Sequence, residues 1–344
     1  MKQNLQRVAL TVLALIVVRM LCSCTLGNTL EIFSQPELAS YLNRTEAEPL
    51  PQTTQPTVQE TQPPTEPPTE PPTEPPTEPP TEPPTLPPVP EYSTVFSTPD
   101  VDFVTMNDTA KQQPDLETLL TQSLDWDLTG NLPQVLIFHS HGTEAFTPVA
   151  GESYKEEGGE YRTTNEDYNM LSLGAELVRL LAEAGITAVH DTSYYDYPDY
   201  LASYDNARIG LQQQLKKYPT VKLVIDLHRD AAEYSNGSQW ATEAFINGEK
   251  SAQIMLVIGT DSYYNHPNWE QNLSVALKLQ TLMEKTHPGV TRPLDLRKQR
   301  FNQDLLPGIV MAEIGAAGNT HREAMNTISV LAEAIIYLSK GANT

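Results

Sequence analysis

The stretch Val135-Leu136-Ile137-Phe138-His139-Ser140-His141-Gly142-Thr143-Glu144 decides the fold expected for this chain. Its first four residues are apolar and lie between a proline and a glycine, which predicts a short buried strand. Polar residues of types that bind metals follow directly. Because open α/β sheets bind ligands just beyond the carboxyl ends of their strands, two imidazoles and a carboxylate mark a candidate site here.

Two further predicted strands end in the same way. Residues 221–227 lead into His228-Arg229-Asp230, and residues 309–312 lead into Glu313. Predicted helices alternate with the strands, at 165–184, 200–217, 269–285 and 321–340. The turn Asn247-Gly248 predicts a hairpin of 241–246 with 253–258. This alternation predicts an α/β fold with a mostly parallel sheet flanked by helices.

The charge of the chain is concentrated outside the predicted domain. The net charge is −22, and residues 25–102 hold 13 acidic residues against one basic residue, which is −12 of that total. Nucleic acid is excluded as a partner because binding it needs a cationic face. The only cysteines are Cys22 and Cys24, so a metal site elsewhere must use His, Asp and Glu.

The N-terminal part predicts export. Residues 1–26 begin with a basic segment, which is followed by an apolar run at 8–18 that extends to residue 26. This pattern is typical of a signal peptide or a membrane anchor. An uncleaved anchor in the cell membrane with an extracytoplasmic domain is favoured over cleavage and secretion. A lipoprotein with Cys24 as its lipidated residue is a further alternative.

The next segments are a juxtamembrane segment (27–50) and a disordered stalk (51–114), followed by a catalytic domain (115–344). Most of the 29 prolines lie between positions 49 and 99, largely in Pro-Pro-Thr-Glu repeats. Such a sequence cannot pack a core and favours extended polyproline II. The stalk is expected to hold the domain away from the membrane, or to act as an inert spacer.

The histidines at the strand ends predict a zinc site. A catalytic zinc commonly takes two histidines and one carboxylate and keeps one position for water. His139 and His141 supply one predicted strand end, and His228 supplies another. Glu144 is the nearest carboxylate, with Glu166 as its rival. The structural alternative is a set of strand-end histidines whose hydrogen bonds are made by the backbone.

Glu313 stands in an otherwise apolar run, which requires either a cationic partner or a function. In the structural interpretation Arg229 pairs with it. In the functional interpretation Glu313 moves a proton from the attacking water to the leaving nitrogen, and Arg229 or His139 stabilises the oxyanion. The remaining histidines are expected at the surface (His266, His287) or in structural roles (His190, His321).

Three blocks resemble the stage II sporulation protein P family: 139–144, 226–231 and 312–320, within a similarity over about 133–340. The resemblance implies a fold like that of zinc N-acetylmuramoyl-L-alanine amidases (the amidase_3 type). It implies a peptidoglycan hydrolase that cuts the amide between N-acetylmuramic acid and L-alanine, and also peptide cross-links. It further implies a role in engulfment, with a stage II sporulation protein D-type lytic transglycosylase and a membrane protein of the same locus as partners.

By the same resemblance, His141 and His228 are zinc ligands, Glu313 is the acid/base, and Glu144 matches the glutamate of a His-x-His-x-x-Glu block. Departures from the family pattern at Ser140 and at 315–317 leave sporulation and ordinary wall remodelling both open. Two other functions remain as alternatives. One is a zinc carboxypeptidase acting on wall peptides, and the other is a wall-binding protein without catalysis.

Overall fold

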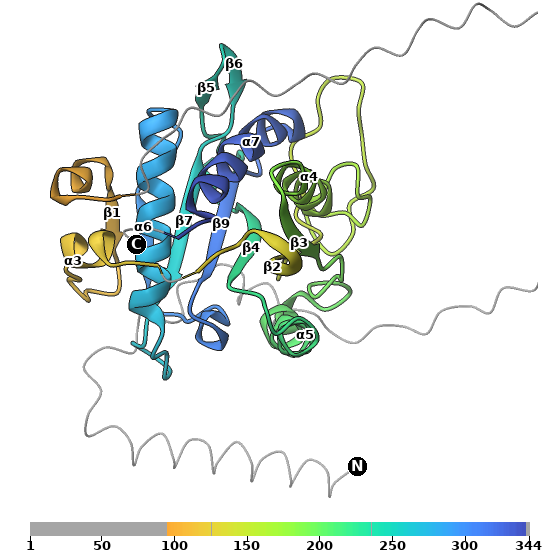
Figure 1. Ribbon diagram of the computed structural model, residues 1–344. Helices are drawn as coiled ribbons and strands as arrows, with labels where there is room; N and C mark the ends of the chain where they lie inside the picture. Colours follow the sequence, from red (N-terminus) through yellow and green to blue (C-terminus); the bar gives the residue numbers. More distant parts are fainter. Residues whose placement is uncertain (1–94, 125, 235, 342–344) are drawn as a thin grey trace, which may run out of the picture. The chain divides into compact units, whose positions relative to one another are not determined.

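The computed structural model describes residues 95–124, 126–234 and 236–341, which form a seven-stranded sheet covered by helices (Figure 1). The strand order is β1-β8-β7-β9-β4-β2-β3. The pair β7–β9 is antiparallel, and the other neighbouring strands are parallel. The expected α/β fold with a mostly parallel sheet is confirmed. The strands of this sheet are β1 (Met106–Asp108), β2 (Gly130–Phe138), β3 (Ile186–His190), β4 (Leu223–Asp230), β7 (Ile254–Gly259), β8 (Leu294–Arg297) and β9 (Ile309–Ala316).

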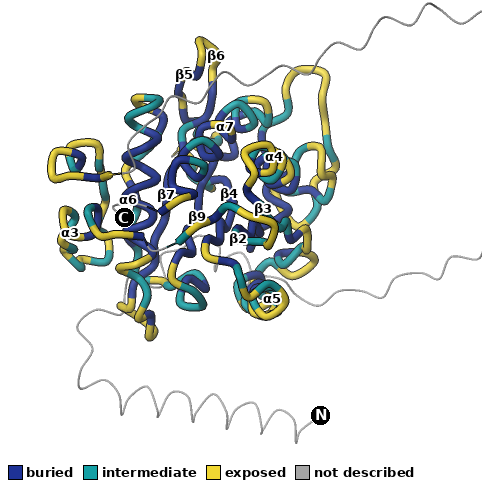
Figure 2. Tube along the Cα trace, in the orientation of Figure 1, coloured by how far each residue is buried: buried dark blue, intermediate teal, exposed yellow. Residues whose placement is uncertain are grey.

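Helices cover both faces of the sheet because alternate residues of a strand point to opposite sides. On β2, Val135 and Ile137 join the core shared with α4, α6 and α7, whereas Leu136 and Phe138 pack with α5. Figure 2 shows the buried residues running through the sheet and the inner faces of the helices. The helices are α3 (Leu116–Thr121), α4 (Met170–Glu183), α5 (Ser203–Lys217), α6 (Trp269–Thr286) and α7 (His321–Leu338).

The fold begins before Asp115, the predicted start of the catalytic domain. A 3-10 helix spans Thr98–Phe103, and β1 pairs with β8 inside the main sheet. Asp115 is the N-cap of α3, where its side chain accepts a hydrogen bond from the Thr118 N–H. The predicted anchor, the juxtamembrane segment and the stalk up to residue 94 lie outside the described residues. Within the described part of the chain, no helix is both long and apolar enough to span a membrane.

The hairpin differs from the expected one. Its strands are β5 (Ala244–Ile246) and β6 (Glu249–Ser251), which pair antiparallel around Asn247 and Gly248. Both turn residues have positive φ, 52° and 82°, as the tight hairpin turn requires. The expected second strand, 253–258, instead enters the main sheet as β7 beside β9. The predicted turn is confirmed, but the predicted pairing partner was wrong, because the strand that follows the turn is the short polar segment Glu249–Ser251, which has no apolar pattern.

Helix α4 starts later than expected. The predicted helix begins at Asn165, which was expected to be its N-cap, but Asn169 is the N-cap, and its side chain accepts a hydrogen bond from the Leu171 N–H at 2.9 Å. The Asn165 side chain accepts a bond from the Asp167 N–H, which makes a local turn. Both asparagines satisfy the sequence rule for a helix start, and the packing of the apolar residues from Met170 onward selects the second.

Candidate metal centre

The candidate metal centre lies at the carboxyl ends of β2 and β4. His141 and Glu144 follow β2 directly, and His228 is near the end of β4. One ligand atom from each residue lies within 4.8 Å of the others, and all three side chains are buried. The two predicted ligands after β2 therefore meet a third, His228, from a distant part of the sequence.

Two nitrogen–oxygen distances within this group have the size expected between ligands of a tetrahedral metal. His141 Nδ1 is 3.6 Å from Glu144 Oε1, and His228 Nδ1 is 3.4 Å from Glu144 Oε2. Zinc bonds of about 2.0–2.2 Å in a tetrahedron place ligand atoms roughly 3.3–3.6 Å apart. Two imidazoles and a carboxylate are also the donor set of many catalytic zinc sites. Residues and geometry are thus compatible with Zn²⁺.

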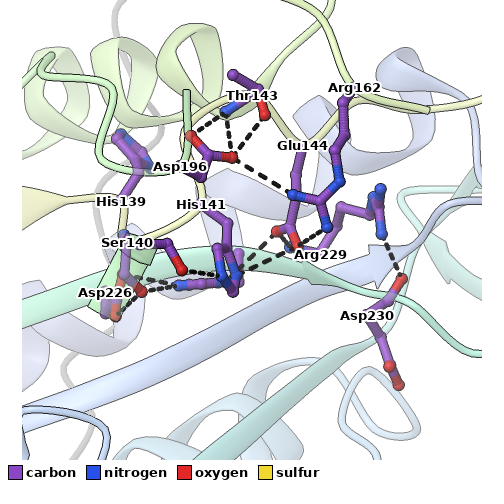
Figure 3. A network of polar contacts seen from close by, with 12 residues as sticks. His139, Ser140, His141, Thr143, Glu144, Arg162, Asp196, Asp226, Arg229 and Asp230 are labelled. Atoms are coloured by element: carbon purple, nitrogen blue, oxygen red, sulfur yellow. Dashed lines mark hydrogen bonds and ion pairs between the residues drawn. The ribbon is translucent and has the colours of Figure 1, made fainter. Parts of the chain in front are cut away.

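The histidine nitrogens that face away from Glu144 have partners of their own. His228 Nε2 is 2.8 Å from Asp226 Oδ1 and 2.7 Å from Ser140 Oγ. His141 Nε2 is 2.9 Å from Ser203 Oγ, at the start of α5. In Figure 3, Asp226 and Ser140 lie on one side of the cluster, and Glu144 lies on the other. Both imidazole rings are therefore fixed by hydrogen bonds at the nitrogen that faces away from Glu144.

The protonation of the group follows from burial and charge. Burial lowers the pKa of His141 to about 3, so this ring is neutral, as a metal ligand must be. Burial alone would raise the pKa of Glu144, but Arg229 together with both histidines lowers it. Burial likewise opposes the charged form of His228, yet Asp226 and Glu144 raise its pKa. Glu144 is thus a buried anion that attracts positive charge.

Glu313 on β9 lies next to this group. It is the Cα partner of His228 in the parallel pair β4–β9, and paired residues of neighbouring strands point to the same face. Its side chain is buried, and its Oε2 has no hydrogen-bond partner in the structure of the described residues. Burial raises the pKa of Glu313 to about 8, with Glu144 and Asp230 adding to the effect. A carboxyl group in this state can both hold and release a proton near neutral pH.

Comparison with known proteins identifies the family to which the chain belongs. The model of the family described as stage II sporulation protein P matches residues 28–336 of the chain. The chain belongs to the stage II sporulation protein P family. The family member of Bacillus subtilis (strain 168) is 26% identical over 240 residues, which are 67% of this chain and 54% of the relative. The chain thus matches about half the length of that relative.

Solved structures similar to this stage II sporulation protein P family member include two amidases. An N-acetylmuramoyl-L-alanine amidase of Nostoc punctiforme is 12% identical, with a TM-score of 0.36, covering 60% of this chain and 96% of its own. An amidase of Clostridioides difficile, solved in complex with a lipoprotein, is 14% identical with a TM-score of 0.35, covering 60% and 98%.

In this family member His139 does not reach the site, contrary to its expected role at the oxyanion. Its ring is fully buried, with Nδ1 2.9 Å from the Leu227 carbonyl and Nε2 2.8 Å from His190 Nε2. Burial lowers its pKa to about 3. Both ring nitrogens are occupied, so His139 has none left for a substrate. The expected structural role of His190 fits this pair.

Among the described residues Arg229 makes no ion pair with Glu313, whereas its expected role at the oxyanion stays a prediction. Its Nε and Nη2 donate hydrogen bonds to the carbonyls of Ala145 and Tyr161, each at 3.0 Å. Its backbone N–H donates to Glu144 Oε2 at 3.1 Å. Arg229 therefore fastens the long loop after β2 and supports the carboxylate of the candidate ligand.

Arg162 and Asp196 are neighbours of the site that were not predicted from the sequence. Arg162 Nη2 is 4.0 Å from Glu144 Oε1, and Nη1 is 3.5 Å from Asp196 Oδ2. The guanidinium lies 3.9 Å from the centre of the Tyr200 ring, which stacks on His141. No sequence signal marks these residues, because their loops have no periodic pattern. The rival ligand Glu166 is exposed and does not belong to the metal-binding group.

His266 was expected at the surface, and this prediction was wrong. Its side chain is fully buried, and Nε2 is 3.1 Å from Asn272 Nδ2 on α6. His321 Nε2 is 2.6 Å from Ser172 Oγ, a contact between α7 and α4 that suits its expected structural role. The residues before His266 gave no hint of burial, because a loop that folds back onto a helix has no repeating pattern.

Proposed function

We propose that this chain is a zinc-dependent peptidoglycan hydrolase that cleaves the amide bond between N-acetylmuramic acid and L-alanine. The observation that carries the proposal is the buried group of His141, Glu144 and His228 beside Glu313, whose Oε2 has no hydrogen-bond partner among the described residues. Membership of the stage II sporulation protein P family supports peptidoglycan as the substrate class.

His141, Glu144 and His228 would hold the metal. Bound zinc would supply a Lewis acid that polarises the scissile carbonyl and lowers the pKa of water. Glu313 takes the proton of the attacking water and delivers it to the leaving amide nitrogen, a transfer that its raised pKa favours. The contacts around the group, such as Tyr200 stacked on His141, restrict access of bulk water.

The cellular setting is part of the same proposal. Residues 1–26 would anchor the protein in the cell membrane, with the catalytic domain outside the cytoplasm. Engulfment during sporulation, with a stage II sporulation protein D-type lytic transglycosylase as partner, is the setting that the family suggests. Removal of residues 1–26 followed by membrane fractionation tests the anchor. Loss from the membrane fraction is the expected result.

Digestion of purified peptidoglycan tests the chemistry. The protein is incubated with peptidoglycan and one equivalent of zinc, and the products are identified by mass spectrometry. We expect free stem peptides with an L-alanine N-terminus and glycan with an intact lactyl group. Loss of terminal D-alanine alone would indicate a carboxypeptidase. Wall binding without any product would indicate a binding protein.

A further inference from the structure

We propose that Ser203 and Asp226 are positioning residues that make both histidines bind the metal through Nδ1. The inference rests on the proposed zinc site and adds to it the ring nitrogen that faces the metal. Ligand histidines usually donate the other ring N–H to a fixed acceptor, which sets the tautomer and orients the ring. The structure supplies one such acceptor for each histidine.

Asp226 holds His228. Its Oδ1 accepts hydrogen bonds from His228 Nε2 and from the Ser140 N–H, both at 2.8 Å, and Oδ2 accepts from Ser140 Oγ at 2.7 Å. The side chain is 1% exposed. A buried carboxylate with these donors keeps a proton on Nε2 of His228. The lone pair that remains for a metal is then on Nδ1, 3.4 Å from Glu144 Oε2.

Ser203 has the same role for His141. Its hydroxyl is 2.9 Å from His141 Nε2, and the residue is buried at the start of α5. The Tyr200 ring stacks on the imidazole at 4.9 Å and Tyr204 meets it edge-on at 5.1 Å, so the ring cannot turn freely. With Nε2–H donated to Ser203 Oγ, Nδ1 faces Glu144 Oε1 at 3.6 Å.

The two positioning residues come from different parts of the fold. Asp226 links the end of β2 to β4 through Ser140, whereas Ser203 belongs to the helix on one face of the sheet. The metal group would therefore depend on how α5 is seated as well as on the strand ends. A change at Ser203 should weaken the site without disturbing the Asp226 contacts.

The first test measures zinc affinity by competition with a chromogenic chelator, which does not depend on activity. Asp226→Asn leaves one acceptor oxygen where three bonds are accepted, and Ser203→Ala removes the acceptor of His141. We expect each variant to bind zinc about 10–100-fold more weakly than the wild type. Ser203→Thr restores a hydroxyl and should recover affinity to within about threefold.

Matched controls separate positioning from general loss of stability. Thr327→Val deletes a buried hydroxyl that donates to the Ala252 carbonyl, and Asp100→Asn changes a buried carboxylate bonded to Ser97. Both lie outside the metal group, so zinc affinity should be unchanged. Long-range nitrogen–proton NMR of the zinc-loaded wild type should show Nε2–H and metal-bound Nδ1 for His141 and His228.

Two outcomes overturn the inference alone: metal-bound Nε2 in the wild-type spectrum, or wild-type affinity in both Ser203→Ala and Asp226→Asn. A wild-type protein that binds no zinc would overturn the proposed function as well. The two failures are distinguishable because the wild type is measured for zinc binding before any variant.

Discussion

The two halves of the sheet use buried ionisable groups in opposite ways. In one half β2, β3, β4 and β9 run in the same direction, so their carboxyl ends meet at one edge. In the other half β7, β8 and β1 run the opposite way, and their carboxyl ends lie at the other edge. The first edge gathers histidines and carboxylates. Helix α6, which packs on the reversed half, buries a single amine, that of Lys278.

This difference between the two halves shows which buried charges are placed so that they could bind a ligand. In the first half His228 lies between the carboxylates of Glu144 and Asp226, so the charges of the candidate metal group are paired with one another. Lys278 donates only to the Leu119 carbonyl and Ser274 Oγ among the described residues. Burial lowers its pKa to about 7. The first arrangement is suited to binding, whereas the second joins α3 to α6 at a cost in stability.

The largest expected effect is at Glu313, in the half of the sheet that carries the candidate metal centre and is here called the functional half. Glu313→Gln keeps the shape of the side chain and removes proton transfer, so kcat on peptidoglycan should fall about 10²–10⁴-fold. Zinc affinity should stay within a few-fold of wild type, because Glu313 is outside the ligand group. Release of stem peptides is the measurement. Wild-type turnover in the variant would refute the assigned role.

A matched control for this change is Glu166→Gln. Glu166 is exposed and was the rival candidate for the third ligand. Its replacement should leave both zinc affinity and stem-peptide release unchanged. A large loss of zinc in Glu166→Gln, together with normal zinc in Glu144→Gln, would reverse the choice between the two carboxylates.

The second prediction concerns the reversed half. Burial lowers the pKa of Lys278 from its ordinary value of 10.5 to about 7 in the folded chain, so the unfolded chain binds more protons between these values. Wild-type stability should therefore rise with pH from 7 towards 10.5, by at most about 1.4 kcal/mol per pH unit. Below pH 7 both states are protonated, and the contribution is constant. Denaturant unfolding between pH 6.5 and 9.5 measures this slope.

Lys278→Met tests whether the Lys278 amine causes this pH dependence of stability. The substitution removes the titrating amine and keeps a long apolar side chain in the same space. The free energy of unfolding of the variant should exceed that of the wild type near pH 7, and the gap should shrink as pH rises. An identical slope in both proteins would show that other groups cause the pH dependence.

The sequence predicted the functional half better than its surroundings. Residues 135–138, 221–227 and 309–312 are apolar runs that end in ligand types, and their parallel arrangement brings those ends together. The boundary at residue 115 came out too late because β1 has only three residues and no periodic pattern. Its place in the sheet depends on pairing with β8, nearly two hundred residues further along the chain.

Contacts made by single side chains were harder to predict. The spacing of His139 and His141 suggested that both point into the site, but the chain leaves strand geometry after Phe138, and only His141 faces Glu144. The roles of Ser203 and Arg162 depend on how α5 and the loop after β2 are seated. Those placements follow from tertiary packing, which no local pattern encodes.

The smallest expected effect lies at the back of the functional half, where α4 passes over the histidine pair. A Cβ added at Gly174 would lie 2.4 Å from His190 Nε2 and 2.7 Å from His139 Nε2. Alanine is favoured over glycine within a helix by about 1 kcal/mol. Overpacking costs about 1–3 kcal/mol. Gly174→Ala should therefore lower the free energy of unfolding by about 0–2 kcal/mol.

The double variant Gly174→Ala/His190→Ala tests whether the clash with His190 causes this loss of stability. Removing the His190 ring clears the closest clash and leaves space into which the His139 ring, 2.7 Å from the added Cβ, can shift. The alanine at 174 should therefore cost less stability in the double variant than in Gly174→Ala alone. Denaturant unfolding of the wild type, both single variants and the double variant gives the coupling energy. A coupling near zero would mean that α4 moves away from the histidines without cost, and that His139 is not held by packing against this helix.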